Sequence, residues 1–204
     1  MPVAGRTLLQ ALPVVQLSGR LVLRHHAPTP KSRVSRLADG PPYWAYLWPG
    51  GAALIAHFEA RPETVRGLRV LDLGAGCGLV GIAAAKTGAR SVIASETDPV
   101  ARTVLRLNAA ENGVSLTVVG DVLDGAAPAV DLIVVGDLFY DPDLAARVIA
   151  FLARAEAISV LVGDIGRADL PVDRLEALAS YPVRDVGDAM AQPHHTGTVF
   201  RFRR

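Results

Sequence analysis

Short apolar segments alternate with helical segments along most of the chain, and this alternation restricts the fold more than any other feature. A short apolar segment between turn residues is typical of a buried strand, and apolar residues at every third or fourth position are typical of a helix. The predicted strands are RVLDL (69–73), SVIASE (91–96), SLTVV (115–119), DLIVVGD (131–137) and SVLVGD (159–164). The predicted helices cover residues 50–61, 79–88, 98–113 and 141–155. Strands that alternate with helices form a parallel sheet covered on both faces, so we expect an α/β fold.

The N-terminal part carries a weaker pattern. Val14–Leu17 and Arg20–Arg24 are extended segments that flank a Ser-Gly pair, which predicts a small hairpin. A loop with prolines and charges follows over residues 26–42. We therefore divide the chain into an N-terminal extension, residues 1–40, and one domain, residues 41–204.

The C-terminal part is less regular. We expect a helix over residues 171–180, then an extended segment PVRDV (182–186) and a last strand TVFRF (198–202). The chain shows no internal repeat that would suggest a solenoid. All of these elements are therefore assigned to the same domain.

Acidic residues stand at or just after the ends of the predicted strands. They are Asp72, Glu96, Asp121, Asp137 and Asp164. In an open α/β sheet, ligands bind in the crevice beyond the carboxyl ends of the strands, where the strand order reverses. The sequence therefore predicts a binding site lined by carboxylates at this edge.

The loop after the first predicted strand is rich in glycine, VLDLGAGCGLVG over residues 70–81. Counted from Gly76 it fits G-x-G-x-x-G, and Glu96 follows at the spacing of a dinucleotide fingerprint, so an NAD-dependent oxidoreductase is one alternative. A tighter pattern is an acid followed by alternate glycines, at Asp72, Gly74, Gly76 and Gly78. This pattern resembles motif I, D/E-x-G-x-G-x-G, of class I S-adenosylmethionine-dependent methyltransferases.

The two candidate ligands differ in charge. A pyrophosphate binds amide N–H groups at a helix N-terminus and would be repelled by Asp72, whereas the ammonium group of S-adenosylmethionine suits a carboxylate. Glycines let the cofactor lie directly against the backbone. Glu96 is expected to accept hydrogen bonds from the ribose hydroxyls and Asp121 from the adenine amino group. We therefore favour S-adenosylmethionine.

The fourth predicted strand ends in D-L-F-Y, residues 137–140, which resembles the D/E-x-x-Y/F motif of protein methyltransferases that modify mainly lysine. Together with YWAYLWPGG (43–51), LNAAEN (107–112) and GDLFYD (136–141), the glycine loop closely resembles the electron transfer flavoprotein beta subunit lysine methyltransferase family. The likeness covers residues 41–167 and, weakly, the last strand. The short N-terminus looks like that of bacterial members, and nothing upstream of the matched segment is carried over.

This resemblance implies a monomeric, class I (Rossmann-like) methyltransferase with a doubly wound, mostly parallel seven-stranded sheet. Segment 198–202 would be its antiparallel last strand, inserted beside the fifth. The implied cofactor is S-adenosyl-L-methionine, with S-adenosyl-L-homocysteine as product, and the implied partner is the beta subunit of electron transfer flavoprotein. A ribosomal-protein lysine methyltransferase is the alternative, although those enzymes usually show N-P-P-Y in the fourth strand or carry a separate substrate-binding domain.

Asp137 and Tyr140 are the predicted catalytic residues. Lysine has a reference pKa of about 10.4 and attacks only as the neutral amine. Asp137 would bind and aim the lysine, but a neighbouring carboxylate also favours the charged lysine, so its role as base or as orienting group stays open. Tyr140 would line the lysine channel and stabilise methylammonium groups by cation–π contact, worth roughly 0.5–2 kcal/mol.

Other residues of the matched segments have weaker assignments. The resemblance implies that Trp48 packs at the edge of the cofactor. Tyr43, Trp44 and Tyr46 either line the acceptor channel or pack under a loop. Asn108 resembles a family position, but we favour its interpretation as a helix residue that bonds to a neighbouring loop.

Composition excludes several classes of function. The formal charge is +1 and hydrophobic residues make up 50%, so no bulk attraction to nucleic acid is expected. No apolar run reaches the roughly 18 residues of a membrane span. The single cysteine, Cys77, excludes an internal disulfide and a cysteine-based zinc cluster, and the histidines lack metal spacing, so we predict no metal. We expect a cytoplasmic protein. If the chain is eukaryotic, we expect a mitochondrial matrix protein, because the segment before Asp39 has arginines and no acid, as organelle transit peptides do.

Overall fold

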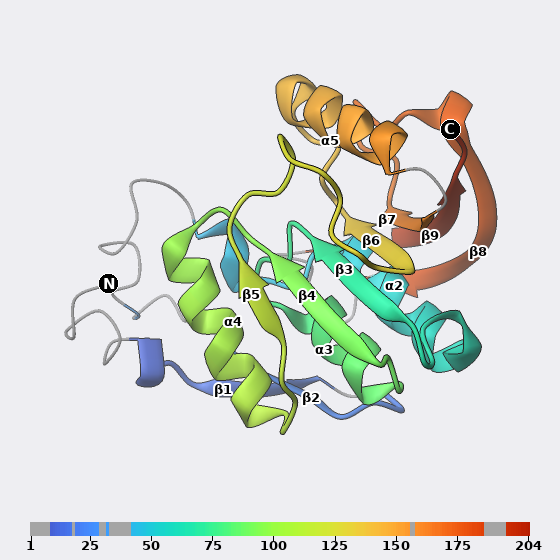
Figure 1. Ribbon diagram of the computed structural model, residues 1–204. Coiled ribbons are helices and arrows are strands. Elements are labelled where there is room, and N and C mark those ends of the chain that lie inside the picture. Colours follow the sequence, from blue (N-terminus) through green and yellow to red (C-terminus); the bar gives the residue numbers. More distant parts are fainter. Residues whose placement is uncertain (1–8, 18, 29–31, 33–41, 156–157, 186–194) are drawn as a thin grey trace.

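The computed structural model describes residues 9–17, 19–28, 32, 42–155, 158–185 and 195–204. Its main element is a seven-stranded sheet with the strand order β5-β4-β3-β6-β7-β9-β8 (Figure 1). The strands are β3 (Arg69–Leu73), β4 (Ser91–Ser95), β5 (Thr117–Val119), β6 (Leu132–Gly136), β7 (Ser159–Asp164), β8 (Leu175–Val183) and β9 (His195–Phe202). The five strands from β3 to β7 pair in parallel, and β9 is antiparallel to both β7 and β8. The predicted fold is confirmed, including the antiparallel last strand inserted beside the fifth.

Helices pack on both faces of the sheet. They are α2 (Pro49–Ala60), α3 (Leu79–Lys86), α4 (Pro99–Glu111) and α5 (Pro142–Arg154). The Asp98 carboxylate accepts hydrogen bonds from the first-turn amides of α4, and Asp141 does the same for α5. In each case the next residue is a proline, whose fixed φ suits the first helical position. Short 3-10 helices lie at Tyr43–Ala45, Pro62–Thr64 and Val172–Arg174.

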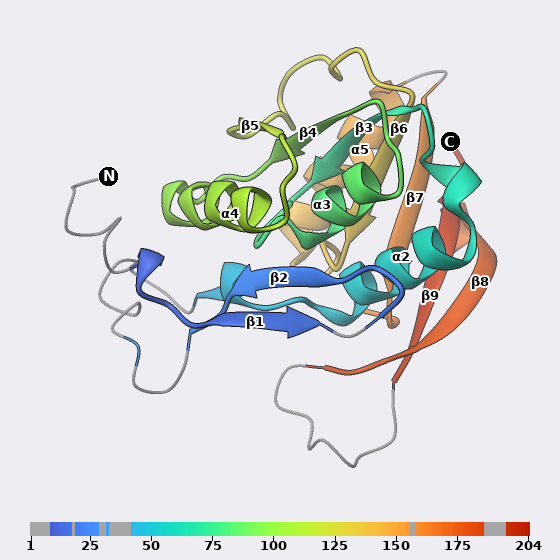
Figure 2. The same ribbon diagram turned by 90° about the horizontal axis from the view of Figure 1, so that it is seen from below.

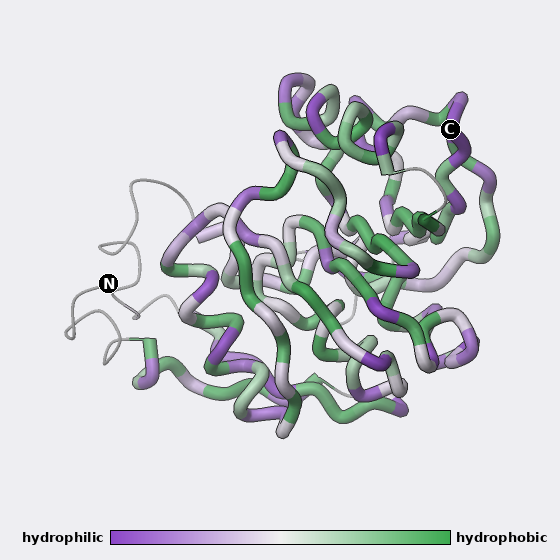
Figure 3. The backbone as a smooth tube through the Cα atoms, in the orientation of Figure 1, coloured by the Kyte–Doolittle hydropathy of each residue, from purple (hydrophilic) through white to green (hydrophobic). Residues whose placement is uncertain are grey.

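The sheet is buried on both faces because successive residues of a strand point to opposite sides. In β3, Val70 packs with residues of α2 and α3, such as Leu54 and Ile82. Its neighbour Leu71 packs on the other side with residues of α5, such as Phe151. Figure 3 shows the resulting concentration of hydrophobic residues along the central strands, with hydrophilic residues on the outer turns of the helices.

A separate two-stranded hairpin lies against the outer side of the helical layer. It consists of β1 (Val14–Leu17) and β2 (Leu23–His26), and β2 contacts α3 and α4 (Figure 2). The predicted hairpin is confirmed, but its second strand begins three residues later than the predicted Arg20. Residue 18 in the turn and most of the predicted loop 26–42 lie outside the described residues, as do residues 1–8.

The helix predicted over residues 171–180 is wrong. After the 3-10 turn at Val172–Arg174 the chain enters β8, which pairs with β9 along its whole length. The ladder contains a register shift between Ala177 and Ala179, so the alternation expected of a strand is interrupted. Leu175 packs with the α5 cluster and Leu178 with the α2 cluster, so these two residues lie on opposite faces of the sheet and not on one face of a helix. Of the extended segment predicted over 182–186, Val183 ends β8 and residue 186 lies outside the described part.

The connections of the sheet place a crevice at the ends of β3 and β6. The chain runs outward from β3 to β4 and β5, then returns to β6 and β7 on the other side of β3. Such a reversal leaves a gap between two diverging loops, the usual ligand position in this architecture. Within the described residues, no helix combines the length and hydrophobicity needed to cross a membrane.

Candidate functional site

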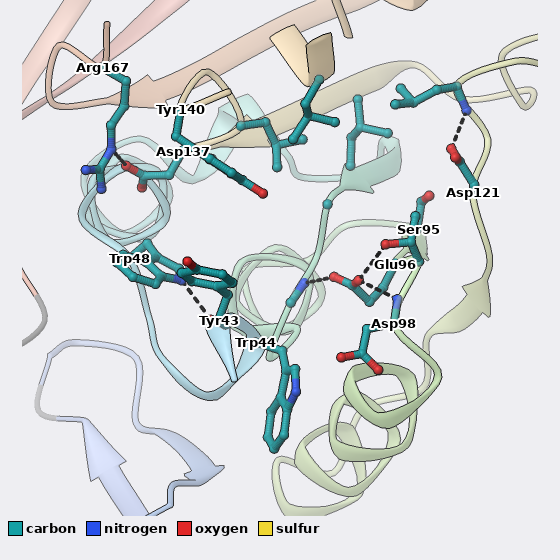
Figure 4. A pocket seen from close by; sticks show the side chains of 18 residues that line it. Tyr43, Trp44, Trp48, Ser95, Glu96, Asp98, Asp121, Asp137, Tyr140 and Arg167 are labelled. Atoms are coloured by element: carbon teal, nitrogen blue, oxygen red, sulfur yellow. Dashed lines mark hydrogen bonds and ion pairs between the residues drawn. The ribbon is translucent and has the colours of Figure 1, made fainter. Parts of the chain in front are cut away.

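A cavity of about 420 Å³ occupies this crevice. Residues from six segments of the sequence line it, including the glycine loop after β3 and the segment after β6 (Figure 4). Seven of the nine predicted site residues line this cavity, namely Trp48, Gly74, Gly76, Glu96, Asp121, Asp137 and Tyr140. Its volume lies within the usual range for small-molecule pockets, roughly 300–1,000 Å³.

The glycine loop presents bare backbone to the cavity. A Cβ added at Gly76 would come no closer than 3.8 Å to the nearest atom, the Cα of Trp44, so a ligand can lie there directly on the main chain. Gly78 does not line the cavity. It precedes α3 with a φ of 81°, and a Cβ there would lie 2.5 Å from Leu105 of α4. Gly78 is therefore required for the turn and for the packing of the loop on α4.

Asp72 also lies outside the cavity lining. Its carboxylate is buried, 2% exposed, and accepts a hydrogen bond of 2.8 Å from the amide of Gly81 in the first turn of α3. Burial raises the pKa of Asp72 to about 7, against the effect of that hydrogen bond. In this structure the carboxylate compensates the N-terminal end of α3, where anions are favoured.

Glu96 connects the glycine loop to the end of β4. One carboxylate oxygen accepts from the amide of Gly76 at 2.8 Å, and the other accepts from the amide of Asp98 at 2.9 Å. Arg102 donates to the carbonyl of Glu96 and fixes the same turn. The side chain is thus held at the cavity wall with lone pairs left for a ligand.

Asp121 follows β5 on the opposite side of the cavity. Its carboxylate accepts from the amide of Leu123 at 2.9 Å and pairs with Arg147 of α5 at 2.9 Å. The hydrogen bond from Leu123 and the guanidinium of Arg147 lower the pKa of Asp121. The group therefore stays a carboxylate through the neutral range.

Asp137 follows β6 and lines the cavity. It is buried, with 6% exposed, and has a φ of 51°, the one positive φ of a non-glycine residue in the described chain. Oδ2 accepts a hydrogen bond from the amide of Gly50 in the first turn of α2, and Oδ1 accepts from Nε of Arg167 at 3.1 Å. Burial, and then the nearby Asp164, raise the pKa of Asp137 to about 6, while Arg167 and Gly50 oppose the rise.

The close approach of α2 to the sheet makes this contact possible. A Cβ at Gly50 would lie 2.1 Å from the carbonyl oxygen of Gly163 in β7 and 2.5 Å from Oδ2 of Asp137. No side chain larger than hydrogen fits there. Gly50 therefore packs directly against β7 and Asp137.

Aromatic side chains form the outer wall of the cavity. Tyr140 is 57% exposed, and its ring stacks on Tyr43 with centroids 6.5 Å apart. The Tyr43 ring lies 6.0 Å from that of Trp48, and the Trp48 indole donates to the carbonyl of Tyr43 at 2.8 Å. Figure 4 shows these rings beside Asp137. Burial raises the pKa of the Tyr140 hydroxyl, so it remains a hydrogen-bond donor.

The residues with weaker sequence assignments lie partly in the cavity lining and partly outside it. Tyr43 and Trp44 line the cavity, whereas Tyr46 does not. Asn108 is buried and donates to the carbonyl of Cys77 at 2.8 Å, while its oxygen accepts from the amide of His26 at 2.8 Å. Asn108 therefore connects the glycine loop to the hairpin, as the structural interpretation of this residue predicted.

Several residues that line the cavity were missed by the sequence reasoning. The additional lining residues are Leu73, Ser95, Thr97, Asp98, Leu123, Gly136, Leu138, Leu144 and Arg167. Most are neighbours of predicted residues, so a wider window around each strand end would have found them. Arg167 follows Asp164, a strand-end acid to which no role was assigned. Cys77 is buried, and burial raises its pKa to about 12, which makes it unsuitable as a nucleophile.

The donor set fits S-adenosylmethionine. The cavity offers bare backbone at Gly76 and carboxylates at Glu96 and Asp121, which match an uncharged sugar and an adenine amino group. The first turn of α3, whose amides would bind a pyrophosphate, does not line the cavity, and its Gly81 amide donates to Asp72. In the part of the chain that is described, no group of three or more His, Cys, Asp or Glu residues could hold a metal ion.

Comparisons with known proteins give consistent results. A family described as lysine methyltransferase matches residues 44–164. The electron transfer flavoprotein beta subunit lysine methyltransferase of Xenopus laevis is 44% identical over 155 residues, which cover 72% of this chain and 63% of that protein. The ribosomal protein L11 methyltransferase of Dichelobacter nodosus is 33% identical over 131 residues, covering 64% of this chain and 44% of that protein.

Among solved structures, a putative RNA methyltransferase from Pyrococcus horikoshii has a TM-score of 0.58 and 23% identity, covering 81% of this chain and 91% of that chain. At this level of identity the likeness concerns the fold, which is that of class I methyltransferases. The chain spans 51% to 63% of the length of the first curated relatives that it matches.

Proposed function

This chain belongs to the lysine methyltransferase family, and from that premise we propose that it transfers methyl groups from S-adenosylmethionine to lysines of the beta subunit of electron transfer flavoprotein. The observation that carries the proposal is the position of Asp137. This buried carboxylate shares one cavity with the glycine loop and Glu96, at the end of β6. The cavity thus brings together a site for a neutral nucleoside and an acid that can receive a cation.

The cofactor would bind along the ends of β3, β4 and β5. Glu96 would accept from its ribose hydroxyls, Asp121 from the adenine amino group, and Trp48 would pack at its edge. Gly74 and Gly76 would support it with bare backbone. Asp72, which faces α3, would act on the ammonium end through the glycine loop or through water.

The acceptor lysine would enter between the aromatic rings. Tyr43 and Tyr140 stand exposed at the mouth of the cavity, and their faces attract an ammonium or methylammonium group. Asp137 lies deeper and is ionised above about pH 6, so it would hold the lysine nitrogen. The aromatic walls would keep the nitrogen aimed at the cofactor, which supplies an electrophilic methyl group.

The lysine must lose a proton before transfer. Asp137 or a water molecule would take it, and the raised pKa of Asp137 makes this carboxylate a better proton acceptor than an exposed one. The lone pair of the amine would then form a bond to the methyl carbon of S-adenosylmethionine. The bond between that carbon and sulfur would break, and its electron pair would stay on the sulfur. The products are methyllysine and S-adenosylhomocysteine.

The experiment uses the purified chain with radiolabelled S-adenosylmethionine and three kinds of acceptor. These are the purified beta subunit of electron transfer flavoprotein, purified ribosomal proteins and a total cell lysate, followed by mass spectrometry of each labelled band. Wild type is compared with Asp137→Ala. Label on lysines of the flavoprotein subunit that disappears with the variant is the expected result.

A ribosomal protein is the second candidate acceptor, supported by the 33% identity to the L11 methyltransferase. Label confined to ribosomal protein would transfer the proposal to that substrate. Label on no protein, despite measured cofactor binding, would disprove the protein-lysine activity. Reduction or oxidation of a nicotinamide cofactor by the chain would instead support the oxidoreductase alternative.

We also propose that the chain acts as a monomer in the cytoplasm. Cys77 is a buried free thiol, which fits the reducing compartment of this proposal. Light scattering of the purified protein tests the oligomeric state, and fractionation of the source cells tests the compartment. A dimer in light scattering, or enrichment in another compartment, would contradict these two proposals.

A further inference from the structure

Arg167 contacts the two groups that a lysine cation would use. Its Nε donates to Oδ1 of Asp137 at 3.1 Å, and its guanidinium carbon lies 5.9 Å from the centroid of the Trp48 ring. The side chain lines the cavity and is 25% exposed (Figure 4). The guanidinium is therefore held on two sides, by the ion pair with the carboxylate and by the cation–π contact with the aromatic ring.

The turn after β7 fixes this arginine through Asp164. One carboxylate oxygen of Asp164 accepts from the amides of Gly166 and Arg167, both at 2.7 Å. Asp164 is 0% exposed, and its other oxygen has no hydrogen-bond partner among the described residues. Because buried Asp164 binds the amide of Arg167, it fixes the backbone from which the Arg167 side chain extends. The ion pair with Asp137 is therefore set by the fold and is not formed by a freely moving surface side chain.

We propose that Arg167 is a positioning residue for methyl transfer, a fixed counter-ion that shares Asp137 with the acceptor lysine and keeps that lysine neutral. The inference rests on the proposed lysine methyltransferase activity and explains how it overcomes a conflict. A carboxylate alone would stabilise the ammonium form of the lysine, which is not a nucleophile. With a guanidinium already on Oδ1, the charge next to the lysine nitrogen is largely compensated.

Asp137 retains room for the lysine. A carboxylate has about four lone-pair sites, and here one is used by Gly50 and one by Arg167. The lysine nitrogen can therefore bond to Asp137 without displacing either donor. The guanidinium thus reduces the attraction for a cation but leaves the hydrogen-bond acceptor that aims the amine.

Two charged side chains and one backbone amide face Asp137 from the elements packed around it. Arg167 and Asp164 come from β7 and its following turn, and the amide of Gly50 comes from the N-terminus of α2. Tyr140 belongs to the same segment as Asp137 and lines the same cavity. Arg167 is the one full positive charge in this set. Removing it leaves two buried carboxylates compensated only by backbone dipoles, so its loss raises the pKa of Asp137.

The test is the pH dependence of kcat/KM with the purified beta subunit of electron transfer flavoprotein as acceptor. Wild type is compared with Arg167→Gln, Arg167→Lys and Arg201→Gln. Arg201 also pairs with an acid, Glu176, but lies at the exposed surface, so its variant is the matched control. An opposite charge at this range shifts a carboxyl pKa by about 1–3 units.

Arg167→Gln is expected to move the whole profile to higher pH by about one unit or more. Both the ionisation of Asp137 and the deprotonation of the lysine then need higher pH. Each unit by which the lysine pKa rises lowers the neutral fraction about tenfold, so the rate near pH 7 falls at least tenfold and the deficit narrows as pH increases. Arg167→Lys keeps the charge and is expected to keep the wild-type midpoint, and Arg201→Gln is expected to resemble wild type throughout.

Three results would overturn the proposal. An equal loss of rate at every pH indicates a purely structural role for Arg167. An unchanged rate shows that the arginine is irrelevant. A shift of the Lys variant as large as that of the Gln variant shows that charge is not the cause.

A measurement without acceptor separates this inference from the proposed activity. The midpoint of the Asp137 carboxyl carbon is followed by NMR titration and assigned by its absence in Asp137→Asn. We expect a midpoint near pH 6 in wild type and a higher one in Arg167→Gln. Equal midpoints would disprove the counter-ion role, whereas a shifted midpoint in a protein that methylates no lysine would disprove the proposed function alone.

Discussion

Gly50→Ala is expected to damage both the fold and the site, because Gly50 is the contact between α2, β7 and Asp137. The new Cβ would lie 2.1 Å from the carbonyl oxygen of Gly163 and 2.5 Å from Oδ2 of Asp137. Overpacking of a core costs about 1–3 kcal/mol, and the upper end applies here because the nearest atom belongs to backbone of the central sheet. Displacing the hydrogen bond to the Asp137 carboxylate adds about 1.5–3 kcal/mol.

Helix propensity offsets part of this cost. Alanine is about 0.5–1 kcal/mol better than glycine within a helix, so the net loss in the free energy of unfolding is about 3–5 kcal/mol. For a chain of this size, that corresponds to a fall in Tm on the order of 10 °C. Urea unfolding followed by circular dichroism measures the first quantity and thermal unfolding the second.

Gly51→Ala is the matched control in the same helix. Its Cβ would lie 3.2 Å from the side-chain ends of Leu47 and Val80, which can move by a few tenths of an ångström. We expect this variant to unfold within about 1 kcal/mol of wild type, since propensity and crowding nearly cancel. If Gly50→Ala were as stable as Gly51→Ala, the close packing of α2 on β7 would be refuted.

Three further variants test the carboxylates. Asp137→Asn should lower methyl transfer by about 10²-fold or more while changing cofactor affinity measured by calorimetry less than threefold; retained activity would exclude a role for the charge. Glu96→Gln should weaken S-adenosylmethionine binding about 10- to 100-fold, because charge-assisted hydrogen bonds are worth about 1.5–3 kcal/mol, and unchanged affinity would place the ribose elsewhere. Asp72→Asn should remove a pH dependence of stability. The folded pKa of Asp72, about 7, is above its ordinary value of 3.8, so the folded protein binds the proton more tightly and wild-type stability should fall as pH rises from about 4 to 7. Urea unfolding at a series of pH values should show that the free energy of unfolding depends less on pH in the variant than in wild type. The same pH dependence in both proteins would contradict the raised pKa.

The parallel part of the sheet was predictable because its signals are local. Each strand from β3 to β7 is a short apolar segment, and Asp98 and Asp141 mark helix starts with a proline directly after them. The end of the sheet was not predictable in the same way. Leu175 and Leu178 have a spacing that also suits one face of a helix, and only the pairing with β9 makes this segment a strand.

The acids at the strand ends were found by sequence, but their different surroundings were not. Asp72 and Glu96 both belong to the predicted motif, yet Asp72 is buried against α3 and Glu96 lies in the cavity. The side of the strand determines this difference, because Asp72 alternates with Leu71 and Leu73 and points to the face covered by α3. The sequence pattern predicts which acids stand at the strand ends, but it does not predict which of them a helix covers.

The donors that hold the cavity acids are the least predictable part of the site. Gly76 donates to Glu96, Arg147 pairs with Asp121, and Arg167 pairs with Asp137. Neither arginine belongs to a motif that the sequence singled out, and each comes from an element remote from its acid. Glu96, Asp121 and Asp137 would therefore each meet a ligand with two internal donors already in place. Binding then depends on lone pairs that these donors leave free, and the orientation of each carboxylate is set before the ligand arrives.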